Sequence, residues 1–258
     1  MASLTEPSPS PAVSVVVPVY YEHEVIAETL EGLERTLDRA AEILVVYDLE
    51  EDPTATVVRE GMVSRWPRAR LVKNEYGRGV VGALKTGIAQ AAGKHIVVYM
   101  ADLSDEPVVI SRMLEKADQG YDLVAASRYM RGGAQIGAPR FKAFLSSMAG
   151  RSLHVLARLP VHDATNSFRL YSQDLVRSVT IESTGGFEVA IELTVKAFLQ
   201  GRPMAEVPTT WRERTAGTSK FELRKWLPSY LRWYFYLLLR APLGVRLRPL
   251  RRGDGVAG

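Results

Sequence analysis

The sequence lacks cysteine entirely, and this absence excludes several kinds of site at once. Without a thiol there can be no disulfide framework, no thiolate metal ligand and no cysteine nucleophile. No run of 18 or more uncharged apolar residues occurs, so we expect no conventional transmembrane helix. No signal peptide is visible either, because residues 1–12 are polar and rich in proline and serine; they predict a disordered tail. Together these features predict a cytoplasmic location.

The composition is that of a globular protein with a full core. The chain has 258 residues, of which 47% are hydrophobic, and a net charge of +4. The basic excess is uneven, since lysines and arginines recur from Arg212 to Arg252. A basic end favours anionic partners such as phosphates or an acidic membrane surface, and we expect no nucleic acid partner.

The first half alternates between short apolar runs and segments with helical spacing. Strands are predicted at 13–17, 43–47, 71–73, 96–100 and 122–126, and a helix is predicted after each of the first four. This alternation predicts an α/β fold with a mostly parallel, doubly wound, Rossmann-like sheet. Polar or charged residues follow the predicted strands at their C-terminal ends, where ligands bind in such sheets. The pattern predicts a single ligand cleft.

The segment 94–107 is the most informative of these strand ends. Its apolar run stops at Asp102, Ser104, Asp105 and Glu106. An oxygen-only cluster suits a hard divalent cation, Mg or Mn, which commonly bridges a protein to phosphates. The alternative is a solvated acidic turn that begins the helix near Pro107.

A glycine-rich segment, GRGVVG at 77–82, offers a rival function. It matches the G-x-G-x-x-G pattern of dinucleotide-binding proteins, and Asp102 follows at a suitable distance, so an NAD-dependent dehydrogenase is one alternative. The loop 73–75 before Gly77 does not fit the tight turn of that fingerprint. The simpler interpretation is that the glycines ease a loop and a helix start.

The second half is less regular. Helices are predicted at 141–159 and 187–199, strands near 171 and at 204–208, a basic loop at 211–220, and an aromatic-rich segment at 226–239 interrupted by Pro228. We predict four regions: a disordered tail (1–12), one domain (13–221), amphipathic helices (222–243) and a basic flexible tail (244–258).

Seven motifs stand in the order expected of family 2 glycosyltransferases, and they most resemble the dolichol-phosphate-mannose synthase-like branch. They are PVYYEHEVI, VVYDLEEDPT, GRGVVGALKTGIAQAAGKHIVVYMADLSDEP, SRYMRGG, DATNSFRLY, GFEVAIELTVKAFLQG and VPTTWRERTAGTSKF. The resemblance covers residues 13–234. It implies a GT-A fold and an inverting transfer of a hexose from a nucleotide diphosphate sugar, with a GDP- or UDP-sugar as donor.

The resemblance also implies site residues. Those of the nucleoside pocket would be Pro18, Tyr20, Glu22 and Asp48, with Arg78 near the nucleotide. Asp102 would hold the metal on the diphosphate, with Ser104 or Asp105 nearby. The family usually has Asp-x-Asp here, and Met100 stands where the first Asp is expected.

Four cations would complete the site by the same resemblance: Arg128, Arg169, Arg214 and Lys220. They can neutralise the leaving diphosphate or receive a phosphate acceptor. The alternative for each one alone is a surface ion pair.

The acceptor can be argued partly from its chemistry. A hydroxyl acceptor needs a general base, for which Asp163, Glu188 and Glu192 are the candidates, whereas a phosphate acceptor is already anionic. The balance favours a polyprenyl phosphate. The alternatives are a soluble hydroxyl acceptor and, because of Met100, a nucleotide-binding partner subunit without catalytic activity. An oligomeric state is also compatible with the sequence.

The aromatic segment 226–239 mixes Trp, Tyr, Leu and Arg, as in helices that lie at a membrane interface. We predict a peripheral contact with the inner face of the cell membrane, with Trp233 and Arg232 among its anchors. The alternative is a helix packed on the domain or in an oligomer interface.

Overall fold

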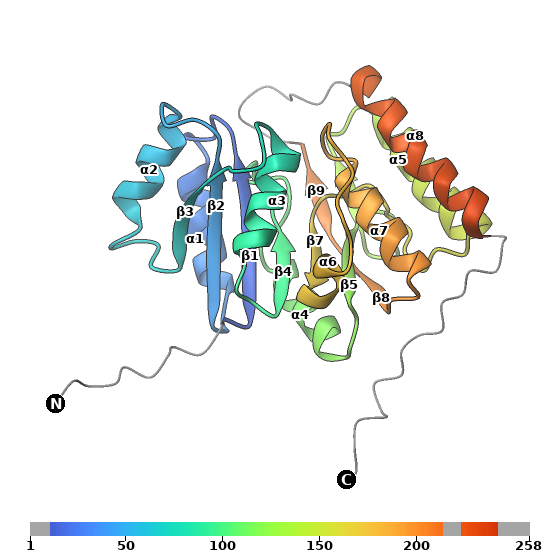
Figure 1. Cartoon of the computed structure of the whole chain (residues 1–258), viewed down its shortest axis with the longest axis horizontal. Coiled ribbons are helices and arrows are strands. Elements are labelled where there is room, and N and C mark those ends of the chain that lie inside the picture. The colour runs from blue at the N-terminus through green and yellow to red at the C-terminus, as the bar shows by residue number, and fades with distance from the viewer. Residues whose placement is uncertain (1–10, 214–222, 242–258) are drawn as a thin grey trace, which may run out of the picture.

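The computed structural model describes residues 11–213 and 223–241, and it shows an α/β architecture built on a seven-stranded sheet (Figure 1). The strands of that sheet are β1 (Val13–Val19), β2 (Ala41–Tyr47), β3 (Ala69–Lys73), β4 (His95–Val98), β5 (Leu123–Ser127), β7 (Arg169–Ser172) and β8 (Met204–Pro208). A second sheet pairs β6 (Ala134–Ile136) with β9 (Thr210–Arg212). The helices are α1 (Ile26–Thr36), α2 (Pro53–Gly61), α3 (Val80–Gln90), α4 (Val109–Asp118), α5 (Arg140–Leu156), α6 (Gln173–Arg177), α7 (Val189–Leu199) and α8 (Leu223–Arg240).

The prediction of a mostly parallel, doubly wound sheet is confirmed. The strand order is β3-β2-β1-β4-β7-β5-β8, and every pairing is parallel except those of β7. Strand β7 lies between β4 and β5 and runs against both, so Arg169 is paired with Val98 on one side and with Ala125 on the other. The loop that precedes β7 therefore lies at the edge of the sheet where the parallel strands end.

Helices cover both faces of the sheet and bury two hydrophobic cores. Because successive strand residues point to opposite faces, Val15 and Val17 belong to one core and Val16 to the other. Helices α1, α2 and α4 close the first core, and α3, α5, α6, α7 and α8 contribute to the second. Apolar burial on both faces explains why the strands read as continuous Val, Ile and Leu runs.

Helix α8 packs on the domain, and this corrects one prediction. Trp233 is 3% exposed and Leu237 is fully buried in the second core, while the Tyr234 hydroxyl lies 2.9 Å from Ser152 Oγ on α5. Trp233 is thus a core residue and cannot be an interfacial anchor. Pro228 lies inside the helix and does not end it, although a proline there removes one i→i−4 hydrogen bond.

Within the described ranges, no helix is long and apolar enough to cross a membrane. Most of the predicted disordered tail 1–12, the predicted boundary between residues 221 and 222, and the predicted flexible tail 244–258 lie outside the described residues. The four-region division therefore remains a prediction.

Replacing Trp233 with Ala should lower the free energy of unfolding by about 3–5 kcal/mol, because it leaves a large cavity in a packed core. Phe235 lies two residues away on the same helix but is 53% exposed. The matched variant Phe235→Ala should therefore change stability by only about 0.5 kcal/mol. Urea denaturation of both variants measures the difference, and equal small losses would contradict the packing of α8.

Candidate active site

Polar side chains gather at one edge of the sheet, where the parallel strands end. Tyr20 follows β1, Asp48 follows β2, Asn74 follows β3, Arg128 follows β5 and Thr209 follows β8. The segment with Asp102 comes just after β4, and the loop before β7 reaches the same edge because β7 is antiparallel. This placement is consistent with the single cleft that the sequence predicts at the carboxyl ends of the strands.

The residues predicted for the nucleoside pocket surround the end of β1. Pro18 is buried within the strand, and the half-exposed rings of Tyr20 and Tyr21 meet edge to face, with centroids 5.0 Å apart. The backbone N–H of Tyr21 donates to Asp52 Oδ2 at 2.8 Å, and that of Glu22 donates to Thr54 Oγ1 at 2.9 Å. The start of α2 therefore fixes the loop that carries the two tyrosines.

Asp48 is held by two donors, one at the end of β3 and one in the glycine-rich loop. Its Oδ1 accepts a hydrogen bond from Asn74 Nδ2 at 2.6 Å, and its Oδ2 accepts one from the backbone N–H of Gly79 at 2.8 Å. A carboxylate can accept about four hydrogen bonds, so this one keeps acceptor capacity for a ligand N–H or hydroxyl. The structure gives Asp48 a bracing role that the sequence did not predict.

The Asn74 amide ties the end of β3 to the glycine loop and to α3. Its Nδ2 also donates to the carbonyl of Gly77 at 2.7 Å, while its Oδ1 accepts from the N–H of Tyr76 at 3.0 Å and from Thr86 Oγ1 at 2.9 Å. Sequence reasoning treated Asn74 only as part of a loop. The strand-end pattern that selected Asp48 and Asp102 would have selected it too, because it directly follows β3.

The glycines at 77–82 permit the backbone conformation of this loop. Gly77 and Gly79 have φ values of +89° and +102°, which favour glycine. A Cβ added at Gly82 would lie 1.8 Å from the Gly77 carbonyl oxygen, so the loop can fold back over α3 only because Gly82 has no side chain. Arg78, at the tip, is exposed and forms no ion pair with any residue in the described ranges.

The acidic segment after β4 is only partly open. Asp102 is half-buried, and its Oδ1 accepts the backbone N–H of Ser104 at 3.1 Å. Asp105 is 8% exposed and accepts from Thr209 Oγ1 at 3.2 Å. Burial raises the pKa of Asp105 to about 7, although the positive charge of Arg128 opposes the shift. Asp105 is therefore turned toward the interior, unlike Asp102.

The predicted metal set of Asp102, Ser104 and Asp105 fits a cation only in part. In the parts of the chain that the structure describes, no three His, Asp or Glu side chains are grouped to hold a metal. The Ser104 hydroxyl is buried and has no hydrogen-bond partner among the described residues, so one unused oxygen lies two residues from Asp102. One carboxylate suffices for Mg when phosphates and waters supply the other ligands.

Arg128 and Asp163 form a buried ion pair. Arg128 Nε lies 2.7 Å from Asp163 Oδ2 and its Nη2 lies 3.0 Å from Oδ1, in a bidentate arrangement, and Nη2 also donates to Ser146 Oγ and Thr165 Oγ1. Burial alone would raise the pKa of Asp163, but the charge and hydrogen bonds of Arg128 outweigh it and lower that pKa to about 2. Asp163 is thus an ionised partner and not a free base. No signal in the sequence singled out Ser146, which lies inside an amphipathic helix.

Arg169 lies in the interior and not at the open edge. It is fully buried on β7, and its guanidinium donates to the carbonyls of Asn166 and Asp163, both at 2.6 Å, and to Thr194 Oγ1 at 2.9 Å. It cannot touch a ligand in this conformation, so the structure does not bring it together with the other predicted cations. Its donors shape the loop 163–168. Arg214 and Lys220 lie outside the described residues.

Glu188 and Glu192 are both committed to one loop. Glu188 is 1% exposed and accepts from the N–H groups of Gly185 and Gly186 at 3.0 and 2.7 Å. Glu192 is fully buried and accepts from the N–H groups of Glu182 and Ser183, at 2.6 and 2.8 Å, and from Lys196 Nζ at 2.7 Å. These contacts support the interpretation of the two carboxylates as braces, which hold the loop at residues 182–186.

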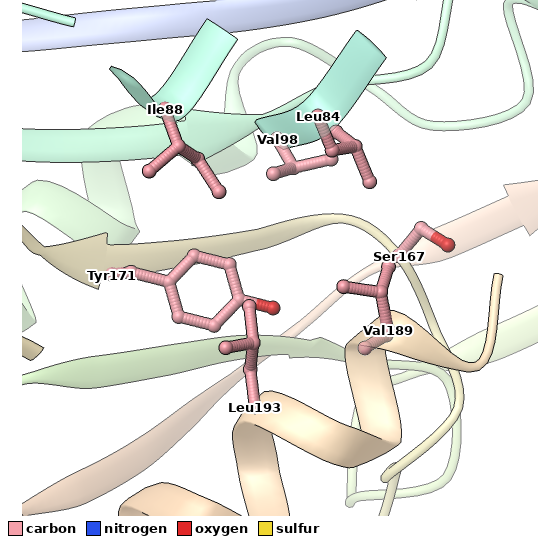
Figure 2. A pocket seen from close by; sticks show the side chains of 8 residues that line it. Leu84, Ile88, Val98, Ser167, Tyr171, Val189 and Leu193 are labelled. Carbon is pink, nitrogen blue, oxygen red and sulfur yellow. The ribbon is translucent and has the colours of Figure 1, made fainter. Parts of the chain in front are cut away.

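A narrow crevice lies between α3 and α7, and Figure 2 shows Leu84, Ile88 and Val98 facing Tyr171, Val189 and Leu193 across it. Its lining is apolar apart from the hydroxyls of Ser167 and Tyr171, and it contains no charged residue. A diphosphate needs cationic partners, so this crevice is not where the charged part of a nucleotide would lie.

Replacing Asp163 with Asn should lower the free energy of unfolding by about 3–5 kcal/mol, because it leaves the Arg128 charge buried and unpaired. The loss should shrink in acid. Since its folded pKa is depressed, the carboxylate stabilises the protein fully above about pH 4 and loses this contribution as the pH falls toward 2. Urea denaturation at several pH values follows both effects.

The double variant Arg128→Met with Asp163→Asn is the control, because it removes the unpaired charge. It should regain part of the stability lost by Asp163→Asn alone. If the losses of stability measured for Arg128→Met and for Asp163→Asn simply add in the double variant, the two side chains are not coupled.

Comparison with known proteins agrees with this geometry. The family model described as glycosyl transferase family 2 matches residues 14–180. The chain is 29% identical to a dolichol-phosphate mannosyltransferase of Pyrococcus furiosus over 230 residues, which cover 88% of this chain and 63% of that protein. It is 29% identical to a polyprenol monophosphomannose synthase of Mycolicibacterium smegmatis over 217 residues, 82% of each chain. The chain thus spans less than two thirds of the first relative and most of the second.

The fold has solved counterparts. The glucosyl-3-phosphoglycerate synthase of Mycobacterium tuberculosis, solved with Mn²⁺, UDP and glucosyl-3-phosphoglycerate, superposes with a TM-score of 0.66 over 90% of this chain and 80% of that one. At 18% identity this likeness concerns the fold alone. The predicted GT-A fold and the dolichol-phosphate-mannose synthase-like branch are confirmed, and the dehydrogenase alternative is set aside. The chain belongs to glycosyl transferase family 2.

Proposed function

We propose that this enzyme transfers a hexose, with inversion, from a GDP- or UDP-sugar to a polyprenyl phosphate. The acceptor oxygen attacks the anomeric carbon as its bond to the nucleoside diphosphate breaks, so no covalent enzyme intermediate is needed. The relatives named for transfer to dolichol phosphate and polyprenol support this class of acceptor.

The observation that carries the proposal is the engagement of all three candidate bases. Asp163 is paired with Arg128, Glu188 accepts from two backbone N–H groups, and Glu192 accepts from two more and from Lys196. None of them is free to take a proton from a hydroxyl acceptor. A phosphate acceptor needs no base, because it is already anionic.

The chain's own residues bind and orient the donor in this proposal. Asp48 offers its remaining acceptor capacity to the nucleoside, the tyrosines after β1 flank that pocket, and Arg78 extends from the glycine loop toward the nucleotide. Asp102, with the unused hydroxyl of Ser104, would hold a divalent cation, Mg or Mn. When bound, that cation would offset negative charge on the leaving diphosphate. Arg214 and Lys220 are proposed to contribute further positive charge.

One observation favours the alternative of a soluble hydroxyl acceptor. The pKa of Asp105, raised to about 7 by burial, is suited to a general base near neutral pH. Its side chain is 8% exposed and bound by Thr209, however, so a hydroxyl would have to reach it in the interior. The acceptor experiment below separates the two cases.

Incubation with a panel of GDP- and UDP-sugars, with Mg, Mn or a chelator, tests the reaction. We expect transfer to a polyprenyl phosphate to be at least ~100-fold faster than to the matched polyprenol, because only the hydroxyl needs a general base. Mass spectrometry of the lipid products identifies the sugar. Faster transfer to a soluble hydroxyl compound, lost in Asp105→Asn, would favour the alternative. Nucleotide binding without any transfer would indicate a non-catalytic partner subunit.

Asn74→Ala should weaken nucleoside diphosphate binding about tenfold, because Asp48 and the Gly77 carbonyl each lose a hydrogen bond of about 1 kcal/mol. Calorimetry with GDP and UDP measures the change. Gln90→Ala is the matched control, since it removes another side-chain amide, at the far end of α3, whose oxygen accepts a hydrogen bond from Arg70. Equal affinities for both variants and the wild type would contradict a positioning role for Asn74.

A further inference from the structure

The segment that follows β4, residues 101–106, contains a backbone conformation that its sequence does not favour; it is called the cation segment below. Leu103 has a φ value of +57°, in the left-handed region. That region is uncommon for residues other than glycine, because Cβ comes too close to the backbone. Leu103 lies between Asp102 and Ser104, the two residues proposed to hold a cation. Such strain persists only where the surrounding structure imposes it.

Two hydrogen bonds to backbone carbonyls hold the cation segment in place. The Ser104 carbonyl accepts from the backbone N–H of Arg212 on β9 at 2.8 Å. The Asp105 carbonyl accepts from the hydroxyl of Tyr99, which is buried, at 2.5 Å. The segment after β4 is therefore tied to a strand that the chain forms more than 100 residues later.

The side chain of Asp105 is held by Thr209, the residue that joins β8 to β9. Thr209 Oγ1 donates to Asp105 Oδ1 at 3.2 Å, and both residues are buried. The backbone of Thr209 is itself fixed, because its N–H donates to the Ser127 carbonyl at 3.1 Å and its carbonyl accepts from the Ala134 N–H at 3.0 Å. Strands β5 and β6 thus set the position from which the hydroxyl reaches Asp105.

This support matters because the cation segment offers few ligands. Met100 places a thioether where a first Asp is usual in the resembled family. The Ser104 hydroxyl is buried and has no hydrogen-bond partner among the described residues. With fewer carboxylates to hold a cation, the orientation of the remaining oxygens matters more, and the groups behind metal ligands set that orientation.

We propose that Thr209 is a positioning residue for the bound cation. Its hydroxyl holds Asp105, and Asp105 keeps Leu103 in the left-handed conformation. That conformation presents the Asp102 carboxylate and the Ser104 hydroxyl to one cation, which Thr209 itself does not touch. The inference rests on the proposed function only for the presence of a divalent cation beside a nucleoside diphosphate.

Mn²⁺ binding in the presence of GDP or UDP tests the proposal without sugar transfer, and the electron paramagnetic resonance signal of free Mn²⁺ measures it. Thr209→Val removes the hydroxyl and keeps the shape, so we expect it to weaken Mn²⁺ binding about tenfold. Thr209→Ser keeps the hydroxyl and should restore the affinity. Thr36→Val on α1 is the matched control, because that hydroxyl also donates one hydrogen bond, to the Gly32 carbonyl at 2.8 Å. Equal affinities in Thr209→Val and the wild type would overturn the proposal.

Substitutions of Asp105 test the link between Thr209 and the cation segment. Asp105→Asn keeps an oxygen that can accept from Thr209, so it should retain the Mn²⁺ affinity, whereas Asp105→Ala should lose it by the same factor as Thr209→Val. The double variant Thr209→Val with Asp105→Ala should lose no more, because both changes remove one hydrogen bond. A large loss in Asp105→Asn would make Asp105 a cation ligand instead, and additive losses would contradict the link.

Two substitutions of Leu103 separate positioning from simple packing. Leu103→Gly adopts the left-handed conformation without strain and should keep most of the Mn²⁺ affinity. Leu103→Val keeps more apolar surface, but a β-branched residue rarely adopts a positive φ, so the affinity should fall about tenfold. A packing role alone predicts the reverse order, and that order would overturn the proposal. Both variants leave the Thr209 hydroxyl in place, so they also decide the question if Thr209→Val does not fold.

The failure of this proposal can be told apart from the failure of the proposed function. Mn²⁺ binding that follows the expected order of variants, without sugar transfer to any acceptor, would leave the role of Thr209 intact and overturn the proposed function. Sugar transfer that is unchanged by a chelator, by a wild-type protein that binds no Mn²⁺ with GDP or UDP, would overturn the role of Thr209 and leave the transfer in place.

Discussion

The ion pair between Arg128 and Asp163 holds together the segments that make the candidate site. Arg128 follows β5, Asp163 begins the loop before β7, and Ser146 on α5 joins them through its hydroxyl. Fully buried Arg169 ties the same loop to α7 through Thr194. Two buried cations and one buried carboxylate thus fix this part of the sheet edge, and a buried charge left without its partner would be costly.

The fold could be predicted largely from the sequence because its signals are local. Continuous apolar runs mark the buried strands, and the polar residue after each run marks the ligand edge, as at Asp48 and Asp102. The antiparallel place of β7 could not be predicted, because it is decided by pairing across more than 70 residues with β4 and by the burial of Arg169. The β6–β9 pair was missed for a similar reason, since strands of three residues carry no periodicity.

Within the site, residue type was easier to predict than residue role. Arg128, Arg169, Glu188 and Glu192 were recognised as charged groups near the cleft, but sequence does not show which partner a charge meets. The structure assigns the two glutamates to backbone N–H groups and Arg169 to carbonyls. Trp233 illustrates the same limit, because an aromatic residue on an amphipathic helix can face either the core or the outside, and only the packing of α8 decides.

The place of β7 has a consequence for how the chain reaches its native state. Strands β1 to β4 can pair among themselves as they are synthesised, but β5 has no neighbour in the sheet until residues 169–172 and 204–208 are available. The two parts of the sheet are therefore joined by a strand that arrives after both β4 and β5. Contacts between residues so distant in sequence form slowly. The buried guanidinium of Arg169 reaches its acceptors only when β7 pairs with β4 and β5. A nascent chain that ends before Ser172 has an open edge at β4, which makes this edge the point where the unfinished protein is exposed to mispairing.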